Sequence, residues 1–450
     1  MSDLGAIFKA YDVRGIVPDQ LDTDIARRVG AAFARFALDT EGPCEQICVA
    51  RDMRPSGVEL QAAFIDGVNA QGVDAVDIGL ASTDLLFYAS GALDSPGAML
   101  TASHNPAEYN GIKLSLAGAR AVGEDSGLAE VRRLTEEPPP DAPVRGTRSE
   151  RELLPDYVRH VRSFVDVAAL KPLRVVADTA NGMGGLVAPA VFDGLPFELE
   201  VLYGELDGTF PNHPADPIQL ENLRDLQARV VATHADVGLA FDGDADRVFL
   251  VDEQAQPVSG SLTTAIVAAA ILEKEPGATI LHNLICSKAV PESIREAGGI
   301  PIRTRVGHSL IKKVMAETGA AFGGEHSGHY YFRDNYRADS GIITALIVLE
   351  RISKTGEPLS QLRRPFERYA ASGERNTRVD DIGAVLERVA AAFPDATQDR
   401  LDGLTVDAGD WWFNLRPSNT EPLLRLNLEA ATQDEVDRRV AEVQAVMAAR

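Results

Sequence analysis

The sequence predicts an α/β protein built from several similar units and completed by one α+β unit. Apolar runs typical of buried strands alternate with helical patterns over most of the chain, and this alternation begins anew near residues 170 and 279. From about residue 370, short strands and two helices replace it. The length agrees with this division, because 450 residues are too many for one simple core and predict roughly two to four domains.

The first unit is expected to contain three strands, over 46–50, 73–80 and 97–102. An amphipathic helix over 56–71 lies between the first two strands, and Ser56 is its predicted N-cap. Strands separated by helices predict a parallel or mostly parallel sheet. The stretch 136–149 is polar and rich in proline, which predicts a linker.

The next two units repeat this pattern. The second is expected to have strands over 173–177, 237–241 and 248–251. The third is expected to have strands over 279–284 and 302–306 and a closing helix over 340–355. The tail is expected to have helices over 380–392 and 433–449 and strands over 404–407, 411–415 and 423–429. We therefore expect four domains, spanning 1–145, 146–252, 253–368 and 369–450.

Composition and charge exclude several classes of protein. Hydrophobic residues make up 45% of the chain and charged residues 25%, which is typical of a globular protein and not of a disordered or collagen-like one. The formal net charge of −23 disfavours nucleic acid and anionic lipid as partners. No apolar run approaches the roughly 18–20 residues that span a bilayer, and the N-terminal segment lacks signal-peptide features. We expect a cytoplasmic protein with no membrane partner.

The three cysteines are expected to be reduced thiols, because they are few and odd in number. Cys44 and Cys48 could form half of a metal site. No second pair of cysteines or histidines with suitable spacing accompanies them, which disfavours that interpretation.

The motif TASHNP at 101–106 follows the third strand of the first unit. Ser103 is therefore placed at the carboxyl edge of a sheet, where α/β proteins bind ligands. Adjacent side chains on an extended segment point to opposite sides, so we expect His104 not to activate Ser103. The sequence also lacks a G-x-S-x-G elbow here, which disfavours a Ser-His-Asp hydrolase. A polar turn with a capping serine is the alternative.

The motif DGDADR at 242–247 places Asp242, Asp244 and Asp246 at alternate positions after a buried strand. Hard divalent cations prefer oxygen ligands, so the three carboxylates predict a magnesium site with room for a phosphate oxygen. An EF-hand calcium loop is disfavoured, because Arg247 stands where the sharp turn requires glycine. A solvated acidic turn is the other alternative.

The motif GGEHSGH at 323–329 suits a polyhydroxylated ligand. Its small residues let the backbone approach a ligand closely. Glu325, Ser327 and His329 stand at alternate positions and can present a carboxylate, a hydroxyl and an imidazole to one side. The alternative is a glycine-rich turn with a satisfied histidine.

The motif RPSNTEP at 416–422 predicts an anion-binding loop. Arg416 supplies a guanidinium group, and Ser418, Asn419 and Thr420 supply further donors. A surface turn is the alternative. By contrast, NGMGG at 181–185 does not match the G-x-G-x-x-G spacing, which disfavours dinucleotide binding.

Together these loops offer a serine, a metal site, a loop that can bind sugar hydroxyls and a loop that can bind a phosphate. A reaction on a sugar phosphate uses all four. With the segment YDVRG at 11–15, they occur in an order that resembles the α-D-phosphohexomutase superfamily, in particular bacterial phosphomannomutase/phosphoglucomutase. The resemblance covers essentially the whole chain. It implies three similar α/β domains with mixed sheets and a C-terminal α+β domain like the TATA-binding-protein fold, arranged around a central cleft.

The resemblance also implies a reaction. Ser103 resembles the serine that carries a phosphoryl group, which is transferred to mannose 6-phosphate or mannose 1-phosphate, with glucose phosphates as further substrates. A hexose 1,6-bisphosphate is the implied intermediate and activator. Mg²⁺ is the implied cofactor, held by Asp242, Asp244 and Asp246 with a phosphate oxygen on Ser103. The implied partner is the hexose phosphate, and a monomer or weak homodimer is expected.

Site residues follow from the same resemblance. Arg14 and Lys113 resemble basic residues near the phosphoserine, and Lys113 is the expected proton-transfer group, with His308 and His329 as alternatives. The implied substrate-binding residues are Tyr11, Arg247, Lys288, Gly307, His308, Glu325, His326, Ser327, Gly328, His329, Arg416, Ser418, Asn419 and Thr420.

Two positions bear on the choice of substrate. Phosphoglucosamine mutases usually carry glycine where this chain has Ala245 and Asn419, which favours mannose and glucose phosphates. A phosphoglucosamine mutase, a phosphatase and a non-catalytic sugar-phosphate sensor are the alternatives. The presence of Ser103 and all three aspartates disfavours the sensor, because a sensor requires neither.

Overall fold

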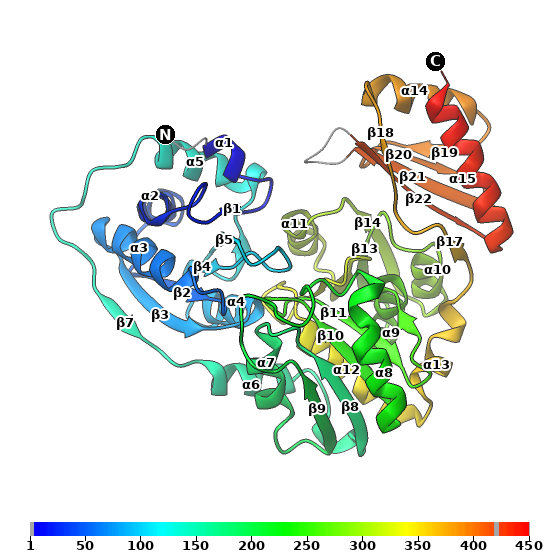
Figure 1. Cartoon of the computed structure of the whole chain (residues 1–450), viewed down its shortest axis with the longest axis horizontal. Helices are drawn as coiled ribbons and strands as arrows, with labels where there is room; N and C mark the ends of the chain where they lie inside the picture. The colour runs from blue at the N-terminus through cyan, green and yellow to red at the C-terminus, as the bar shows by residue number, and fades with distance from the viewer. Residues whose placement is uncertain (1–3, 418–422, 450) are drawn as a thin grey trace.

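The computed structural model describes residues 4–417 and 423–449, apart from the side chain of His308. Four β-sheets follow one another along the chain. Figure 1 shows the N-terminal sheet with its helices at one side, the second and third sheets in the middle, and the C-terminal sheet standing apart at the other end. Three α/β units and one α+β unit are the predicted fold class, which is confirmed.

The first sheet has the order β1-β5-β4-β2-β3-β7, with β6 on β5. Its strands are β1 Val13–Ile16, β2 Gln46–Arg51, β3 Asp74–Leu80, β4 Gly97–Leu100, β5 Tyr109–Leu116, β6 Arg120–Ala121 and β7 Arg148–Glu150. Its helices are α1 Leu4–Ile7, α2 Thr23–Glu41, α3 Gly57–Ala70, α4 Thr83–Ala92 and α5 Leu128–Glu136. The sheet is mixed, because β2 is parallel to β3 and β4 whereas β5 is antiparallel to β4 and β1.

Two details of the first unit differ from the prediction. The stretch expected to be a linker ends in β7, which pairs in parallel with β3. The ion pair of Arg148 with the buried Asp77 also joins these two strands. Ser56 was expected to cap a helix, but its side chain makes no cap hydrogen bond to α3. Its hydroxyl instead accepts a hydrogen bond from Asn110 Nδ2 at 3.0 Å, which ties the start of α3 to β5.

The second sheet has the order β12-β11-β10-β8-β9. Its strands are β8 Leu173–Asp178, β9 Phe197–Leu202, β10 Val237–Phe241, β11 Val248–Asp252 and β12 Pro257–Val258. Its helices are α6 Leu154–Arg162, α7 Gly184–Phe192 and α8 Arg224–Thr233. The buried hairpin of β10 and β11 carries the DGDADR motif at its turn.

The third sheet has the order β14-β13-β15-β16. Its strands are β13 Thr279–Asn283, β14 Ile300–Thr304, β15 Phe322–Gly324 and β16 Tyr330–Phe332. Its helices are α9 Gly260–Lys274, α10 Ala289–Glu296, α11 His308–Thr318, α12 Gly341–Thr355 and α13 Leu359–Leu362. The turn between β15 and β16 carries the GEHSGH motif.

The fourth sheet is antiparallel, with the order β17-β22-β21-β20-β19 and β18 on β22. Its strands are β17 Ala370–Ala371, β18 Arg375–Arg378, β19 Thr397–Asp399, β20 Leu404–Asp407, β21 Trp411–Pro417 and β22 Leu423–Ala430. Its helices are α14 Ile382–Ala392 and α15 Gln433–Ala448. Figure 1 shows both helices on one face of this sheet.

The buried hydrophobic clusters are distributed unevenly among the four units. One buried cluster runs through the first three units, joining residues such as Met99, Leu239 and Leu346. The C-terminal unit has a core of its own, with Phe413 and Leu428 among its buried residues. Among the described helices, none combines the length and the hydropathy that a membrane span requires.

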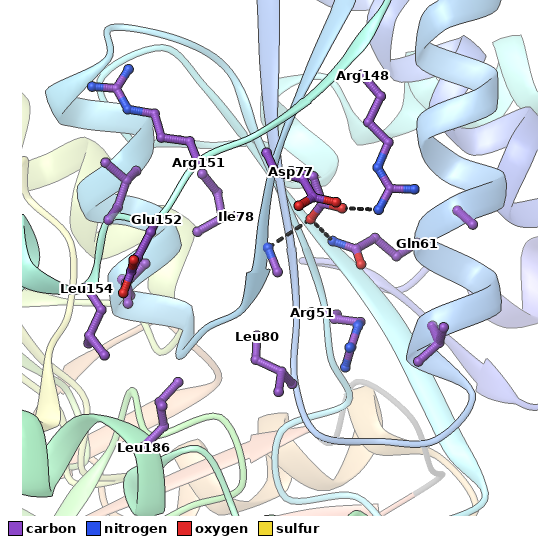
Figure 2. A pocket seen from close by; sticks show the side chains of 16 residues that line it. Arg51, Gln61, Asp77, Ile78, Leu80, Arg148, Arg151, Glu152, Leu154 and Leu186 are labelled. Carbon is purple, nitrogen blue, oxygen red and sulfur yellow. Dashed lines mark hydrogen bonds and ion pairs between the residues drawn. The ribbon is translucent and has the colours of Figure 1, made fainter.

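A crevice of about 600 Å³ lies between the first unit and the start of the second (Figure 2). Asp77 lies in it, paired with Arg148 and accepting a hydrogen bond from Gln61 Nε2 at 2.8 Å. Three arginines and three acidic residues line this crevice, so their formal charges cancel. It contains neither Ser103 nor the aspartates of the DGDADR motif.

Candidate active site

Ser103 lies on the loop that joins β4 to β5, at the carboxyl end of β4. Its backbone is left-handed, with φ of 48°, and the residue is 5% exposed. Its Oγ donates a hydrogen bond to Asp242 Oδ2 at 2.7 Å. The expectation that His104 would point away was wrong, because the left-handed turn is not an extended segment. His104 Nδ1 lies 3.3 Å from Ser103 Oγ.

The three aspartates converge at the turn between β10 and β11. Asp242, Asp244 and Asp246 are all buried, and carboxylate oxygens from the three lie within 4.8 Å of one another. Ala245 between them has a left-handed φ of 61°, which reverses the chain direction and turns the alternate side chains toward one point.

Two cations balance this acidic cluster. Lys113 on β5 places Nζ 2.7 Å from Asp244 Oδ2 and 2.7 Å from Asp246 Oδ2. Arg247 places Nε 2.9 Å from Asp242 Oδ2. The lysine comes from the first unit and the aspartates from the second, so the site lies where these two units meet.

The charges in this cluster shift one another's pKa values. Burial raises the pKa of Asp242 to about 7. Burial alone would also raise the pKa of Asp244, but the charge and hydrogen bond of Lys113 hold it well below its usual range. Burial would lower the pKa of Lys113, but the two carboxylates outweigh burial and raise it, so Lys113 stays protonated.

The cluster fits a hard divalent cation. Asp244 Oδ1 and Asp246 Oδ1 are buried and have no hydrogen-bond donor in the described part of the chain. Leaving buried carboxylate oxygens without a partner is unfavourable, and a cation bound among them would satisfy both. The ligands are all oxygens, as Mg²⁺ requires.

His329 lies beside the same aspartates. Its Nδ1 is 2.8 Å from Asp339 Oδ2 and 3.7 Å from Asp246 Oδ1. Burial alone would lower the pKa of His329, but the charge of Asp246 and the hydrogen bond of Asp339 raise it. With Nδ1 held by Asp339, Nε2 is the ring nitrogen available for proton exchange.

The GEHSGH turn also contains Glu325, His326 and Ser327. Glu325 is 2% exposed, and its carboxylate accepts hydrogen bonds from the Gly307 amide at 3.2 Å and from the Tyr331 hydroxyl at 2.7 Å. Ser327 and His326 are half-buried, and Nδ1 of His326 lies 2.9 Å from Oγ of Ser261 on α9. The carboxylate of Glu325 is therefore fixed in orientation.

Two residues near the start of the first unit contact other parts of the site: Arg14 contacts the loop of Ser103, and Tyr11 contacts the third unit. Arg14 Nη1 donates to Asn105 Oδ1 at 2.6 Å, on the loop of Ser103. The Tyr11 hydroxyl donates to the Val306 carbonyl at 3.1 Å, in the third unit. Gly307 has a φ of 135°, and a Cβ there would lie 2.4 Å from the Tyr11 hydroxyl, so only glycine fits.

A cavity of about 760 Å³ extends from Tyr11 to the C-terminal unit. Its titratable lining includes two acidic residues, Glu124 and Asp125, and five cationic ones, Lys9, Arg132, Arg305, Arg416 and Arg425. Arg416 is 9% exposed, and Glu374 holds its Nη2 at 3.2 Å. In a chain with a net charge of −23, this cavity is locally positive and suits an anion.

Several expected residues lie elsewhere or outside the described part. Lys288 is not brought to the aspartates, because its Nζ lies 3.2 Å from Asp407 Oδ1 in the C-terminal unit. Ser418, Asn419 and Thr420 lie outside the described residues, as does the side chain of His308. Their roles stay predictions.

Some contributors were not expected from the sequence. Asp339 orients His329, and Arg305 and Arg425 add charge to the cavity. Arg54 holds the loop of Ser103. The position of Arg54 was a possible signal of this role, because Arg54 follows β2 and β2 neighbours the strand that leads to Ser103.

The sequence matches four domain families of one enzyme group, in order. They are phosphoglucomutase/phosphomannomutase alpha/beta/alpha domain I over residues 5–138, domain II over 155–256, domain III over 259–369 and the C-terminal domain over 374–446.

Individual proteins match over nearly the whole chain. A protein named "Phosphohexose mutases" from Xanthomonas campestris pv. campestris (strain B100) is 41% identical over 429 residues, covering 94% of each chain. A phosphomannomutase of Salmonella montevideo is 39% identical over 435 residues, again covering 94% of each chain. The crystal structure of a phosphoglucomutase/phosphomannomutase family protein from Burkholderia thailandensis has a TM-score of 0.91 at 33% identity, covering 99% of this chain and 98% of that one.

Proposed function

Since the chain belongs to the phosphoglucomutase/phosphomannomutase family of phosphohexose isomerases, we propose that it interconverts mannose 6-phosphate and mannose 1-phosphate and also accepts glucose phosphates. The observation that carries this proposal is the hydrogen bond of Ser103 Oγ to Asp242, beside two carboxylate oxygens that have no donor among the described residues. A hydroxyl at the edge of a cation site is suited to accept and pass on a phosphoryl group.

In the proposed reaction Ser103 carries the phosphoryl group. The bond between Ser103 Oγ and phosphorus breaks as a bond forms between phosphorus and the free hydroxyl of a hexose monophosphate. The product is a hexose 1,6-bisphosphate, which also serves as the activator that first phosphorylates the serine. After the sugar turns over, its other phosphate returns to Ser103 and the positional isomer leaves.

Positive charge around Ser103 stabilises this transfer. Mg²⁺ bound by Asp242, Asp244 and Asp246 would neutralise charge on the phosphoryl oxygens. Arg247 and Lys113 add fixed positive charge at the same point. Because Lys113 stays protonated, we assign it to charge stabilisation and proton donation rather than to proton abstraction.

The sugar hydroxyl must lose a proton as it attacks phosphorus. We assign the exchange of this proton to Nε2 of His329, since Asp339 holds the other ring nitrogen and the ring lies beside Asp246. Glu325, whose carboxylate is fixed by hydrogen bonds from Asn283, Gly307 and Tyr331, is the residue proposed to bind the sugar hydroxyls.

The phosphate that is not being transferred is proposed to bind in the positive cavity. Arg416 reaches this cavity from β21, and Arg305 and Arg425 lie in its wall. Guanidinium groups suit phosphate because they offer paired donors in one plane. Tyr11 lines the same cavity and Arg14 touches the Ser103 loop, so one short segment links the two ends of the substrate.

Isomerisation of mannose 1-phosphate, glucose 1-phosphate and glucosamine 1-phosphate, measured side by side, tests this function. Each assay contains Mg²⁺ and a trace of glucose 1,6-bisphosphate, and Ser103→Ala is the control. We expect activity on mannose and glucose phosphates that the substitution abolishes. Activity confined to glucosamine 1-phosphate would indicate a phosphoglucosamine mutase, and release of inorganic phosphate without isomerisation would indicate a phosphatase.

A further inference from the structure

Arg54 lies three residues after the end of β2, and its side chain is completely buried at the base of the Ser103 loop. Its guanidinium group donates to four backbone carbonyls of that loop and of the strand it enters. Nη2 donates to Ser103 at 2.8 Å and to Asn105 at 2.7 Å. Nη1 donates to Pro106 at 2.7 Å and to Tyr109 at 2.8 Å.

The fifth donor of Arg54 is also used. Nε lies 3.2 Å from Oδ2 of Asp52, which is itself completely buried. All five N–H groups of the guanidinium therefore have acceptors, and the buried charge has a counter-ion. Lysine cannot reproduce this arrangement, since its three donors radiate from one nitrogen atom.

The carbonyls that Arg54 gathers determine where Ser103 lies. Ser103 has a left-handed φ of 48°, which is unfavourable for a residue other than glycine and is stabilised here by the contacts of the loop. A Cβ on Gly243 would lie 2.4 Å from the Ser103 carbonyl oxygen, so the serine loop lies directly against the loop of the aspartates. A shift of the Ser103 carbonyl would therefore change the contact of Ser103 Oγ with Asp242.

The second unit covers Arg54 from the other side. The ring centroid of Phe210 lies 5.1 Å from the guanidinium carbon, within the range of a cation–π interaction. A Cβ on Gly208 would lie 2.6 Å from the Arg54 Cα, so this segment packs tightly on the arginine. The guanidinium is thus enclosed between the serine loop and the unit that carries the aspartates.

We infer that Arg54 is a positioning residue for phosphoryl transfer, which holds Ser103 at the distance from the aspartates that the reaction requires. It acts through the backbone of the loop. This inference rests on the proposed function, since it assumes that Ser103 carries the phosphoryl group. It adds a residue and a role that follow from the hydrogen bonds of this structure.

The test compares Arg54→Lys, Arg54→Ala and the control Arg148→Ala. Arg148 is a matched control, because it also pairs with a buried carboxylate of the first unit but lies in the crevice of Figure 2. We measure kcat, KM, the rate at which glucose 1,6-bisphosphate phosphorylates Ser103, and the melting temperature. Millimolar guanidinium chloride is then added to each variant.

We expect Arg54→Lys to lower kcat and the phosphorylation rate by about 100-fold, as a misplaced reacting group does, with KM within about threefold of wild type. Guanidinium should raise the activity of Arg54→Ala at least severalfold and leave Arg148→Ala unchanged. Should Arg54→Ala fail to fold, Arg54→Lys decides the question.

Two results would overturn the inference. One is a folded Arg54→Lys that phosphorylates Ser103 at the wild-type rate. The other is an equal loss of kcat in Arg54→Lys and Arg148→Ala, which would indicate a general loss of stability. If the proposed function itself is wrong, the wild-type protein will not be phosphorylated on Ser103. That result distinguishes failure of the proposed function from failure of this inference.

Discussion

The two ends of the candidate site are built differently. The end that contains Ser103 and the aspartates lies on the buried core that runs through the first three units. Hydrogen bonds join its parts across units, such as Thr83 Oγ1 to Asp244 Oδ2 at 2.6 Å. The end proposed to bind phosphate includes Arg416, which belongs to a C-terminal unit with a separate core.

The contacts between that C-terminal unit and the third unit include partly exposed ion pairs. Lys288 pairs with Asp407 and Arg303 with Asp399, with side chains between 28% and 41% exposed. Exposed pairs of this kind contribute about 0–1 kcal/mol each. The comparison teaches that one end of the site is buried and joined across units, whereas the contacts of the other end include weak ion pairs. The proposed turnover of a bisphosphate would require a movement, and we expect it at the second end.

We expect the largest effect from a substitution that removes the proposed reacting hydroxyl at the buried end of the site. Ser103→Ala removes the hydroxyl that is proposed to carry the phosphoryl group, so we expect isomerisation to fall by about 1000-fold or more. The melting temperature should stay close to that of wild type, since Ser103 is a small residue on a loop. A coupled assay and a thermal melt measure both. Residual activity within about tenfold of wild type would assign the phosphoryl transfer to another group.

Removal of the divalent cation should have the next largest effect. EDTA should abolish isomerisation and Mg²⁺ should restore it. Mg²⁺ should also raise the melting temperature, because a ligand that binds only the folded state stabilises it by about 2.7 kcal/mol at 100 times its Kd. Asp244→Asn should lose this thermal shift, whereas Asp407→Asn in the C-terminal unit should keep it. Equal shifts in both variants would place the cation elsewhere.

A change at the end that contains Arg416 should affect substrate binding more than phosphoryl transfer. Arg416→Ala removes a guanidinium from the positive cavity, so we expect KM for mannose 1-phosphate to rise about tenfold or more. Saturating glucose 1,6-bisphosphate should still phosphorylate Ser103. Arg303→Ala, which removes an arginine from the neighbouring interface, is the control. An unchanged KM would contradict the assignment of Arg416 to the phosphate.

The smallest effect concerns the interface itself. Asp407→Ala removes the partner of Lys288, and we expect the free energy of unfolding to change by less than about 1 kcal/mol. Chemical denaturation measures this change. A loss of several kcal/mol would show that the C-terminal unit is held rigidly, and the contrast between the two ends would then disappear.

The sequence predicted the loops of the site better than the contacts among their side chains. Asp242, Asp244 and Asp246 could be predicted to converge, because they alternate after a buried strand. The contact of His104 with Ser103 could not, since the left-handed backbone of one residue decides it. Lys113 and Asp246 are paired by the packing of two units, which no local pattern encodes. The hydrogen bonds of Arg54 could not be predicted either, because its acceptors are backbone carbonyls about 50 residues away. Only its place after β2, beside the strand that leads to Ser103, was a signal.

The most direct test is a single-turnover experiment on the isolated phosphoprotein. Ser103 is phosphorylated with glucose 1,6-bisphosphate labelled in its phosphates, the excess is removed, and mannose 1-phosphate is added with Mg²⁺. The account predicts that the label leaves Ser103 and appears in mannose 1,6-bisphosphate and then in mannose 6-phosphate. Label that appears only as inorganic phosphate, or stays on the protein while substrate is isomerised, would contradict it.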